Sequence, residues 1–206
     1  MRRESPQTKL PSKLTNQPLL VVLSGPSGAG KDAVIAKLKD SDFPIERVVT
    51  VTTRPRRAIE SESVDYHFVS PEKFQEMIRG KKLLEWANVY GNWYGVPQEA
   101  VKQALERGQD VMLRTDVQGA ATIKKTMPQA ILIFLMPASM EELDARLKQR
   151  HTESSLDLAV RTRIAEEEIK KLPLFDYVVF NRQGEIDSAV ADIKAILRAE
   201  KCRVKA

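Results

Sequence analysis

Short apolar runs alternate with segments of helical periodicity along most of this chain. The runs are rich in β-branched residues and lack a polar face, and they predict strands at 18–24, 110–113, 131–136 and 177–180. The periodic segments predict helices at 33–38, 117–126, 139–149 and 186–199. Alternation of this kind indicates an α/β fold in which a doubly wound parallel sheet is covered by helices on both sides.

Two stretches depart from this alternation. Residues 48–94 contain short alternating segments and one helical stretch at 71–79, which predict an inserted, mainly antiparallel subdomain. Within 141–173, two charged helices flank a polar break, and we expect a mobile lid. A disordered tail is expected at 1–17, and the core then comprises 18–47, 95–140 and 174–206.

Composition limits the class of protein. A chain of 206 residues with 42% hydrophobic and 30% charged residues can enclose one substantial core. The single cysteine, Cys202, can build neither a disulfide framework nor a cysteine metal site, which favours a reducing, cytoplasmic setting. No apolar run approaches the roughly 20 residues of a membrane span, so no membrane association is expected.

The net charge of +5 suits nucleic acid or small phosphorylated substrates. The arginines gather in two stretches, 54–57 and 146–163, and form neither a continuous basic helix nor an aromatic RNA-binding motif. The distribution therefore favours small phosphates over nucleic acid.

A glycine-rich turn between the first strand and the first helix predicts a phosphate loop. Its spacing, a glycine, four residues, a second glycine and a lysine, lets backbone N–H groups and a helix N-terminus surround phosphate, while the lysine supplies positive charge to the β and γ phosphates. The predicted ATP-binding loop consists of Gly25, Pro26, Ser27, Gly28, Ala29, Gly30, Lys31 and Asp32.

The last residue of this loop departs from the usual pattern. A serine or threonine hydroxyl normally follows the lysine and holds Mg²⁺, whereas this chain has Asp32. A carboxylate can also bind magnesium, so Asp32 is a candidate Mg²⁺ ligand. The alternative is that Asp32 only stabilises the start of the helix, where acidic side chains are favoured.

Several further motifs follow in order. They comprise the segments 50–57 (TVTTRPRR), 64–69 (VDYHFV), 84–87 (LEWA), 90–95 (YGNWYG) and 116–119 (DVQG). With the phosphate loop they make the chain resemble the guanylate kinase family from Leu20 to about Ala199. The resemblance implies transfer of a phosphoryl group from ATP to GMP, and to dGMP, with Mg²⁺ as the cofactor.

The resemblance also implies the acceptor site. Arg54, Arg57, Tyr66 and Tyr94 match positions that hold the GMP phosphate, and guanidinium forks and phenolic hydroxyls suit a dianion. Glu85 matches the acid that accepts hydrogen bonds from guanine N1–H and the 2-amino group. Adenine offers no such pair of donors, so this carboxylate would select guanine. The remaining implied GMP-binding residues are Thr50 and Asp116.

Two further positions differ from the family. Val96 stands where relatives commonly have a hydroxyl that donates to guanine O6, and Arg114 stands where they usually have an acid. Asp32 and Arg114 together contribute no net charge, whereas the usual hydroxyl and acid contribute one negative charge. We therefore expect Asp32 and Arg114 to face each other across the magnesium and phosphate site.

The resemblance places three arginines in the lid, Arg146, Arg150 and Arg161, where with Lys31 they would stabilise the charge of the transferring phosphoryl group. Asn181 matches a residue beside the donor adenine. The acceptor phosphate oxygen itself attacks, so neither His67 nor His151 is needed as a base. The lid and the inserted subdomain would close to exclude water.

Two other functions fit parts of the sequence. A related kinase could act on a ribosyl phosphate, although Glu85 would then have no guanine to bind. A catalytically impaired module that binds nucleotides or proteins is compatible with Asp32 and Arg114, but the retained Lys31 and arginines favour catalysis. We expect a monomer or a weak homodimer.

Overall fold

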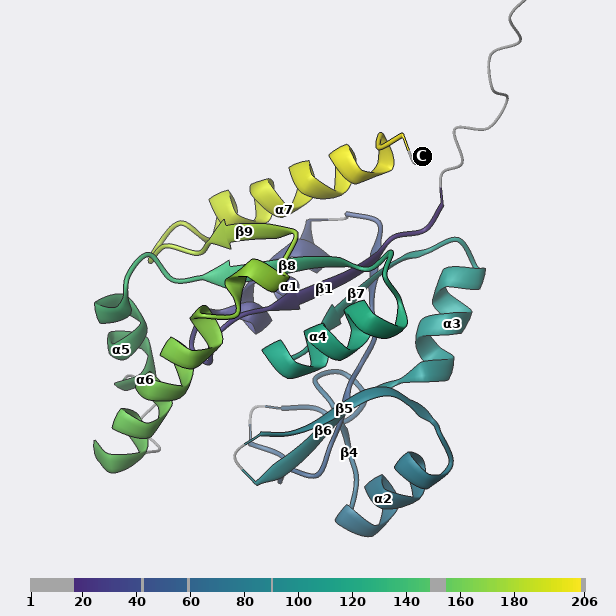
Figure 1. Cartoon of the computed structure of the whole chain (residues 1–206), viewed down its shortest axis with the longest axis horizontal. Coiled ribbons are helices and arrows are strands. Elements are labelled where there is room, and N and C mark those ends of the chain that lie inside the picture. The colour runs from purple at the N-terminus through teal and green to yellow at the C-terminus, as the bar shows by residue number, and fades with distance from the viewer. Residues whose placement is uncertain (1–16, 42, 59, 90, 149–154, 205–206) are drawn as a thin grey trace, which may run out of the picture.

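The computed structural model describes residues 17–204 except 42, 59, 90 and 149–154, and only the backbone of 155–159 and 161. Within this part of the chain, the larger sheet has five strands, all parallel (Figure 1). In spatial order they are β2 (Ile45–Arg47), β7 (Asp110–Arg114), β1 (Leu20–Ser24), β8 (Ile131–Met136) and β9 (Tyr177–Phe180).

Strand β1 lies in the middle of this sheet. It pairs with β7 through Leu20 and Val111, and with β8 through Val21 and Ile131. All five residues of β1 are buried, which explains why its sequence has no polar alternation. The carboxyl ends of parallel strands meet at one edge, so the segments that follow β1, β7 and β9 come together there.

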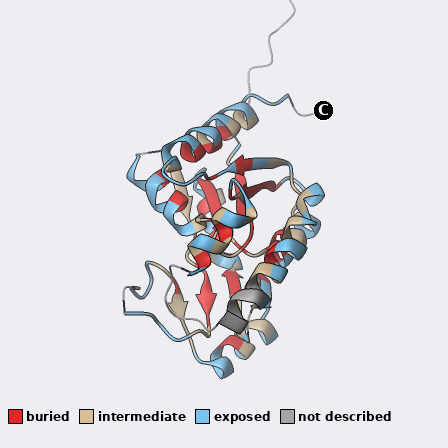
Figure 2. Ribbon diagram, turned by 90° about the vertical axis from the view of Figure 1, so that its left-hand side faces the viewer, coloured by how far each residue is buried: buried red, intermediate tan, exposed pale blue. Residues whose placement is uncertain are grey.

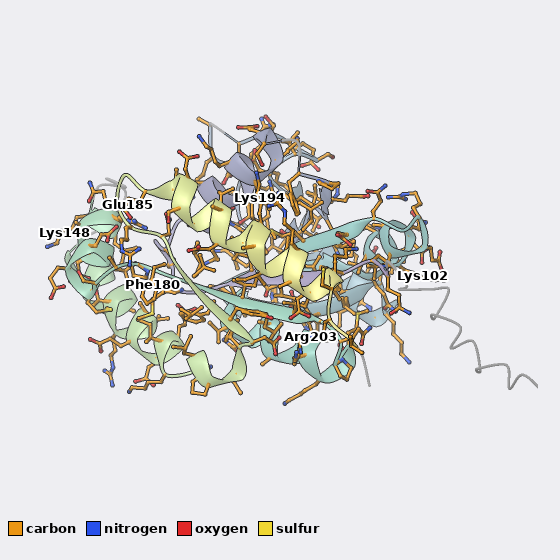
Figure 3. The ribbon with its side chains drawn as sticks, turned by 90° about the horizontal axis from the view of Figure 1, so that it is seen from above. Lys102, Lys148, Phe180, Glu185, Lys194 and Arg203 are labelled. Atoms are coloured by element: carbon orange, nitrogen blue, oxygen red, sulfur yellow. The ribbon has the colours of Figure 1, made fainter. Side chains whose placement is uncertain are left out.

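Four helices cover the two faces of the larger sheet. Val21 and Leu23 of β1 pack toward α1 (Lys31–Asp40) and α7 (Ile186–Lys201), whereas Leu20 and Val22 pack toward the other pair of helices. That other pair consists of α3 (Gln98–Glu106) and α4 (Val117–Thr126). Buried residues accordingly lie in the sheet and on the helix faces that cover it (Figure 2). The view from above shows α7 crossing this sheet, with Glu185 just before it and Arg203 just beyond it (Figure 3).

A smaller sheet is formed by the chain between β2 and α3. Its order is β4 (His67–Phe68), β3 (Val51–Thr52), β6 (Asn92–Pro97) and β5 (Leu83–Val89). The β3–β4 pair is parallel, and the other two pairs are antiparallel. Helix α2 (Pro71–Arg79) begins with Ser70 as its cap and buries Phe74 against Val51 and Leu83, which gives this sheet a core of its own.

Helices α5 (Met140–Lys148) and α6 (Ser155–Ile169) lie beside each other beyond the end of β8 (Figure 1). Leu143, Leu147 and Ala165 form a buried cluster between them, separate from the two clusters of the larger sheet. A short 3₁₀ helix, η1 (Leu172–Leu174), then leads to β9.

The predicted α/β fold with a parallel sheet is confirmed. The elements that were not predicted include β2 and α3. The boundary expected at residue 94 falls inside β6, which continues to Pro97. The expected tail lies, up to residue 16, outside the described residues. None of the helices in the described part is both long and apolar enough to span a membrane.

Candidate active site

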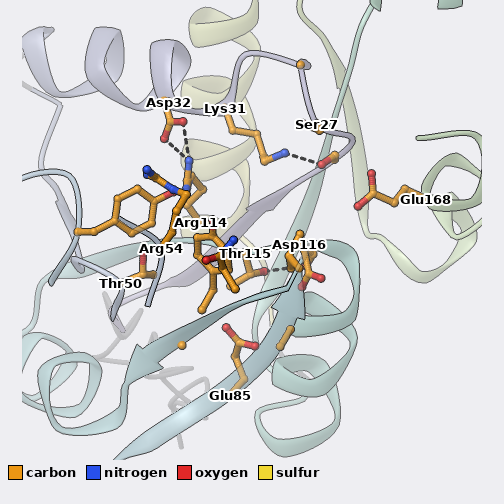
Figure 4. A pocket seen from close by; sticks show the side chains of 18 of the residues that line it. Ser27, Lys31, Asp32, Thr50, Arg54, Glu85, Arg114, Thr115, Asp116 and Glu168 are labelled. Atoms are coloured by element: carbon orange, nitrogen blue, oxygen red, sulfur yellow. Dashed lines mark hydrogen bonds and ion pairs between the residues drawn. The ribbon is translucent and has the colours of Figure 1, made fainter. Parts of the chain in front are cut away.

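A cavity of about 240 Å³ lies where the carboxyl edge of the larger sheet meets β5 and β6 (Figure 4). Its lining contains most of the residues expected at the two nucleotide sites: Gly25, Ser27, Gly28, Gly30, Lys31, Asp32, Thr50, Arg54, Arg57, Tyr66, Glu85, Tyr94 and Asp116. The fold therefore brings the phosphate loop and the predicted acceptor residues to one cavity, although they are up to 91 positions apart in the sequence (Gly25 to Asp116).

The phosphate loop wraps tightly between β1 and α1. Gly25 has a φ of 134°, and a Cβ there would lie 2.1 Å from the backbone oxygen of Leu135, so this position requires glycine. Lys31 folds back over the loop and donates to the carbonyl oxygens of Gly25 at 2.5 Å and Pro26 at 3.0 Å. Burial, together with the nearby Arg114, lowers the pKa of Lys31 to about 8. An anion bound in the loop would favour the charged form of this lysine.

Arg146 and Asn181 brace the outer side of the same loop. Asn181 Nδ2 donates to the Ala29 carbonyl at 2.8 Å, and Arg146 Nη1 donates to the same oxygen at 3.2 Å. Arg146 also donates to the backbone oxygen of Asn181 at 2.6 Å and forms an ion pair with Glu142. Arg150 and the side chain of Arg161 lie outside the described residues. Of the three predicted lid arginines, the structure therefore shows only Arg146, in contact with the loop.

The arginines and tyrosines of the predicted acceptor site lie on the smaller sheet and the segment between β3 and β4. Arg54 donates to Glu60 Oε1 at 2.6 Å, and its guanidinium carbon lies 5.4 Å from the centre of the Tyr66 ring. Tyr94 contacts Tyr66 edge to face, with 5.9 Å between ring centres. Glu60 Oε2 accepts from the backbone N–H of Arg57 at 2.9 Å. One carboxylate thus binds the Arg54 guanidinium and the backbone of Arg57.

A buried acid closes the other end of the cavity. Glu85 is only 4% exposed, and its Oε2 has no hydrogen-bond partner among the described residues. Burial and the nearby Asp116 raise the pKa of Glu85 to about 8. Space for the carboxylate depends on Gly119 in α4, because a Cβ there would lie 2.6 Å from Glu85 Oε2. A buried acceptor without a partner suits a ligand that brings N–H donors.

The position of Asp116 follows from its capping role. Its side chain accepts from the Gly119 N–H at 2.8 Å and starts α4 at the end of β7. Val96 pairs with Glu85 across β5 and β6, but it is fully buried in the core and carries no polar side-chain atom. The described structure therefore has no side-chain hydroxyl at position 96 for a base.

Asp32 and Arg114 form the expected pair, and they are in direct contact. Arg114 Nη1 lies 2.5 Å from both Asp32 Oδ1 and Oδ2. Burial would raise the pKa of Asp32, but Arg114 and then Lys31 outweigh it and hold that pKa below its usual value. The Asp32 side chain remains 60% exposed and that of Arg114 15% exposed, so the acid faces solvent at the mouth of the cavity.

The lining residues that lie outside the predicted motifs include Glu60, Thr115 and Glu168. Glu60 could have been suspected as an acid close to two arginines. Glu168 comes from α6, has one buried oxygen without a described hydrogen-bond partner, and has a pKa raised mainly by burial. No signal marked it, because α6 contains many charged residues and shows no clear apolar face.

The parallel sheet, the phosphate loop at its carboxyl edge and a second polar site in the same cavity define a phosphotransferase of the P-loop kinase class. Comparison with known proteins makes the assignment narrower. The guanylate kinase family model matches residues 17–200, and the chain belongs to this family.

Individual relatives agree with the family assignment. The chain is 44% identical to a guanylate kinase of Caldanaerobacter subterraneus and 46% identical to one of Desulfitobacterium hafniense, with at least 92% of each chain covered. It is 45% identical to guanylate kinase 2, chloroplastic/mitochondrial, of Oryza sativa, covering 91% of this chain and 66% of that relative. The crystal structure of guanylate kinase from Anaplasma phagocytophilum superposes with a TM-score of 0.77 at 33% identity, covering 93% of this chain and 91% of that one.

Proposed function

We propose that this protein transfers the γ-phosphoryl group of ATP to GMP, and to dGMP, in purine nucleotide metabolism. The observation that carries this proposal is the buried Glu85 carboxylate at one end of a cavity whose other side is the phosphate loop. Guanine offers two adjacent N–H donors to such a carboxylate, and adenine does not. A ribosyl phosphate would leave Glu85 without a partner.

The reaction needs alignment and charge stabilisation more than a protein nucleophile. An oxygen of the acceptor phosphate forms a bond to the γ-phosphorus of ATP, and the bond from that phosphorus to the β–γ bridging oxygen breaks, which yields GDP and ADP. Arg54, Arg57, Tyr66 and Tyr94 hold the acceptor phosphate, and Thr50 and Asp116 complete the GMP site. Lys31 and the lid arginines Arg146, Arg150 and Arg161 neutralise the charge of the transferring group.

The donor nucleotide lies along the phosphate loop from Gly25 to Asp32, with its adenine beside Asn181. The contacts of Arg146 and Asn181 with Ala29 support this arrangement, because both side chains already border the loop. Residues 141–173 act as the lid, and 48–94 as the GMP-binding subdomain. We infer a cytoplasmic monomer or weak homodimer.

Mg²⁺ with ATP is the proposed cofactor. The residues present fit this ion, because Asp32 offers a solvent-accessible carboxylate beside the loop, and Mg²⁺ commonly binds one or two carboxylates together with substrate phosphates. When bound, the ion would neutralise phosphate charge. Before Asp32 could bind the ion, its carboxylate would have to separate from Arg114, which donates to both of its oxygens.

A coupled assay of ADP formation with ATP, Mg²⁺ and each nucleoside monophosphate tests the proposal. We expect turnover with GMP and dGMP and little with AMP. Glu85→Gln should lower kcat/KM for GMP at least about 100-fold, because an amide cannot accept from both guanine donors. Glu62→Gln, at a half-exposed acid outside the cavity, is the matched control. Turnover of AMP but not GMP would overturn the substrate assignment.

A further inference from the structure

Arg114 occupies a place in the cavity that the proposed mechanism does not use. It ends β7 beside β1, where Leu23 pairs with it, and it points into the cavity that Lys31 and Arg54 also line. Its guanidinium carbon lies 4.8 Å from the centre of the Tyr66 ring, closer than that of Arg54 at 5.4 Å. Arg114 therefore stands between the phosphate loop and the acceptor phosphate residues (Figure 4).

Two arginines at Tyr66 are each paired with a carboxylate. Arg54 is bound to Glu60 at 2.6 Å, and Arg114 is bound to Asp32 at 2.5 Å. The two pairs differ in exposure. The side chain of Glu60 is 12% exposed, whereas that of Asp32 is 60% exposed and can turn into solvent, where water hydrates its charge. The Asp32–Arg114 contact is therefore the easier one for an incoming anion to replace.

We propose that Arg114 is a third arginine of the acceptor phosphate site, which Asp32 holds in place until the GMP phosphate replaces it. This inference rests on the proposed function and adds a catalytic residue to it. The Tyr66 ring lies 4.8 Å from the guanidinium carbon and helps to position the group. A phosphate dianion offers this guanidinium the same paired oxygens as a carboxylate, with more charge. Asp32 is then free to face the magnesium side of the phosphate loop.

Because Arg114 exchanges Asp32 for the GMP phosphate in this proposal, substitutions at the two residues should change GMP affinity in opposite directions. We expect Arg114→Met to weaken GMP binding at least about tenfold, the loss of one charge-assisted contact. Asp32→Asn should strengthen GMP binding several-fold, because Arg114 is no longer held. The double variant should bind no better than Arg114→Met, since Asp32 acts through Arg114. Arg114→Lys, which keeps the charge but loses the fork, should fall between wild type and Arg114→Met.

Titration calorimetry of the full chain with GMP, in EDTA and without ATP, measures these affinities apart from turnover. Guanosine is the ligand control, because it lacks the phosphate, and its affinity should not differ between wild type and Arg114→Met. Arg107→Met is the protein control, since it breaks an exposed ion pair with Glu46 outside the cavity. Thermal unfolding checks that each variant is folded.

Equal losses of GMP affinity in Asp32→Asn and Arg114→Met would overturn the proposal, because they would mean that the pair only supports the fold. Unchanged GMP affinity in Arg114→Met would also overturn the proposal. So would a double variant that binds GMP better than Arg114→Met, because Asp32 would then act only by repelling the phosphate. ADP formation by the wild-type protein with GMP is measured separately. A failure of the Arg114 proposal is thereby distinguished from a failure of the proposed function.

Discussion

At the scale of single residues, Glu85 links GMP binding to pH. Its pKa of about 8 means that the carboxyl is protonated at pH 7 in the free protein, whereas binding to guanine requires the carboxylate. GMP binding should therefore release close to one proton at pH 7, and affinity should rise by up to about tenfold per pH unit below pH 8 and then level off. Calorimetry in two buffers with different ionisation enthalpies counts the protons.

The matched variant for this experiment is Glu85→Gln, which has no proton to release at this position. Its weaker GMP affinity should be nearly independent of pH between 7 and 8. The same group also affects folding: because its pKa is higher in the folded chain than in the unfolded one, its contribution to stability decreases as the pH rises from about 4.5 toward 8. Binding without proton release in the wild type would contradict the assigned state of Glu85.

The residues of the site differ in how far the sequence could predict them. Arg54, Tyr66 and Glu85 belong to local motifs, and the structure brings all three to one cavity. Asp32 and Arg114 were expected, from two compensating departures from those motifs, to face each other across the magnesium and phosphate site, and in the structure they are in direct contact. Glu168 could not be predicted, because only the tertiary placement of α6 carries it to the phosphate loop.

At the scale of elements, the close approach of α4 to β5 shapes the base site. Gly119 leaves room for Glu85, since a Cβ at position 119 would lie 2.6 Å from Glu85 Oε2 and 3.0 Å from Thr115 Cβ. Gly119→Ala should weaken GMP binding about tenfold or more by displacing the carboxylate. The free energy of unfolding should change by less than about 1 kcal/mol, because alanine favours the helix and the end of a glutamate side chain can move.

Equilibrium binding and urea unfolding separate these two effects of Gly119→Ala. ATP affinity is the internal control and should be unchanged, because the phosphate loop lies at the other side of the cavity. The effect should also disappear in a Glu85→Gln background if it acts through Glu85. A loss of stability of several kcal/mol without a change in GMP affinity would contradict this account.

The elements that the sequence predicted are those with strong local signals. Strands β1 and β8 are continuous apolar runs, and α2 has both a serine cap and a proline at its first turn. Strand β2 has only three residues, two of them charged, and pairs only with β7 among the described strands. Helix α3 packs Ala100, Val101, Ala104 and Leu105 on the core, but no side chain caps its start at Pro97, so it lacks the start signal that marks α2.

At the scale of the whole molecule, the α/β class followed from the alternation of strands and helices, but the strand order did not. Parallel strands with buried faces have similar sequences wherever they lie in a sheet, so tertiary pairing decides the order β2-β7-β1-β8-β9. The meeting of the two sheets at one cavity also depends on contacts between distant segments. One of them is the approach of Gly119 to Glu85.

The helices α5 and α6 should respond to the two nucleotides together. Their shared cluster of Leu143, Leu147 and Ala165 is separate from the cores of the larger sheet, and Leu143 and Leu147 also approach the phosphate loop at Gly28. Such a small cluster allows these helices to open locally, so their amides should exchange quickly in the free protein.

Binding of both substrates should slow hydrogen exchange in α5 and α6 more than binding of either ligand alone. Both sites lie in one cavity, and the same helices close over it when both are occupied. Hydrogen exchange measured with GMP, with a non-hydrolysable ATP analogue and with both checks this expectation. Helix α3, which contributes no residue to the cavity lining, is the internal control and should change little. Protection of α5 and α6 by the ATP analogue alone, with no further slowing when GMP is added, would mean that closure does not depend on the acceptor.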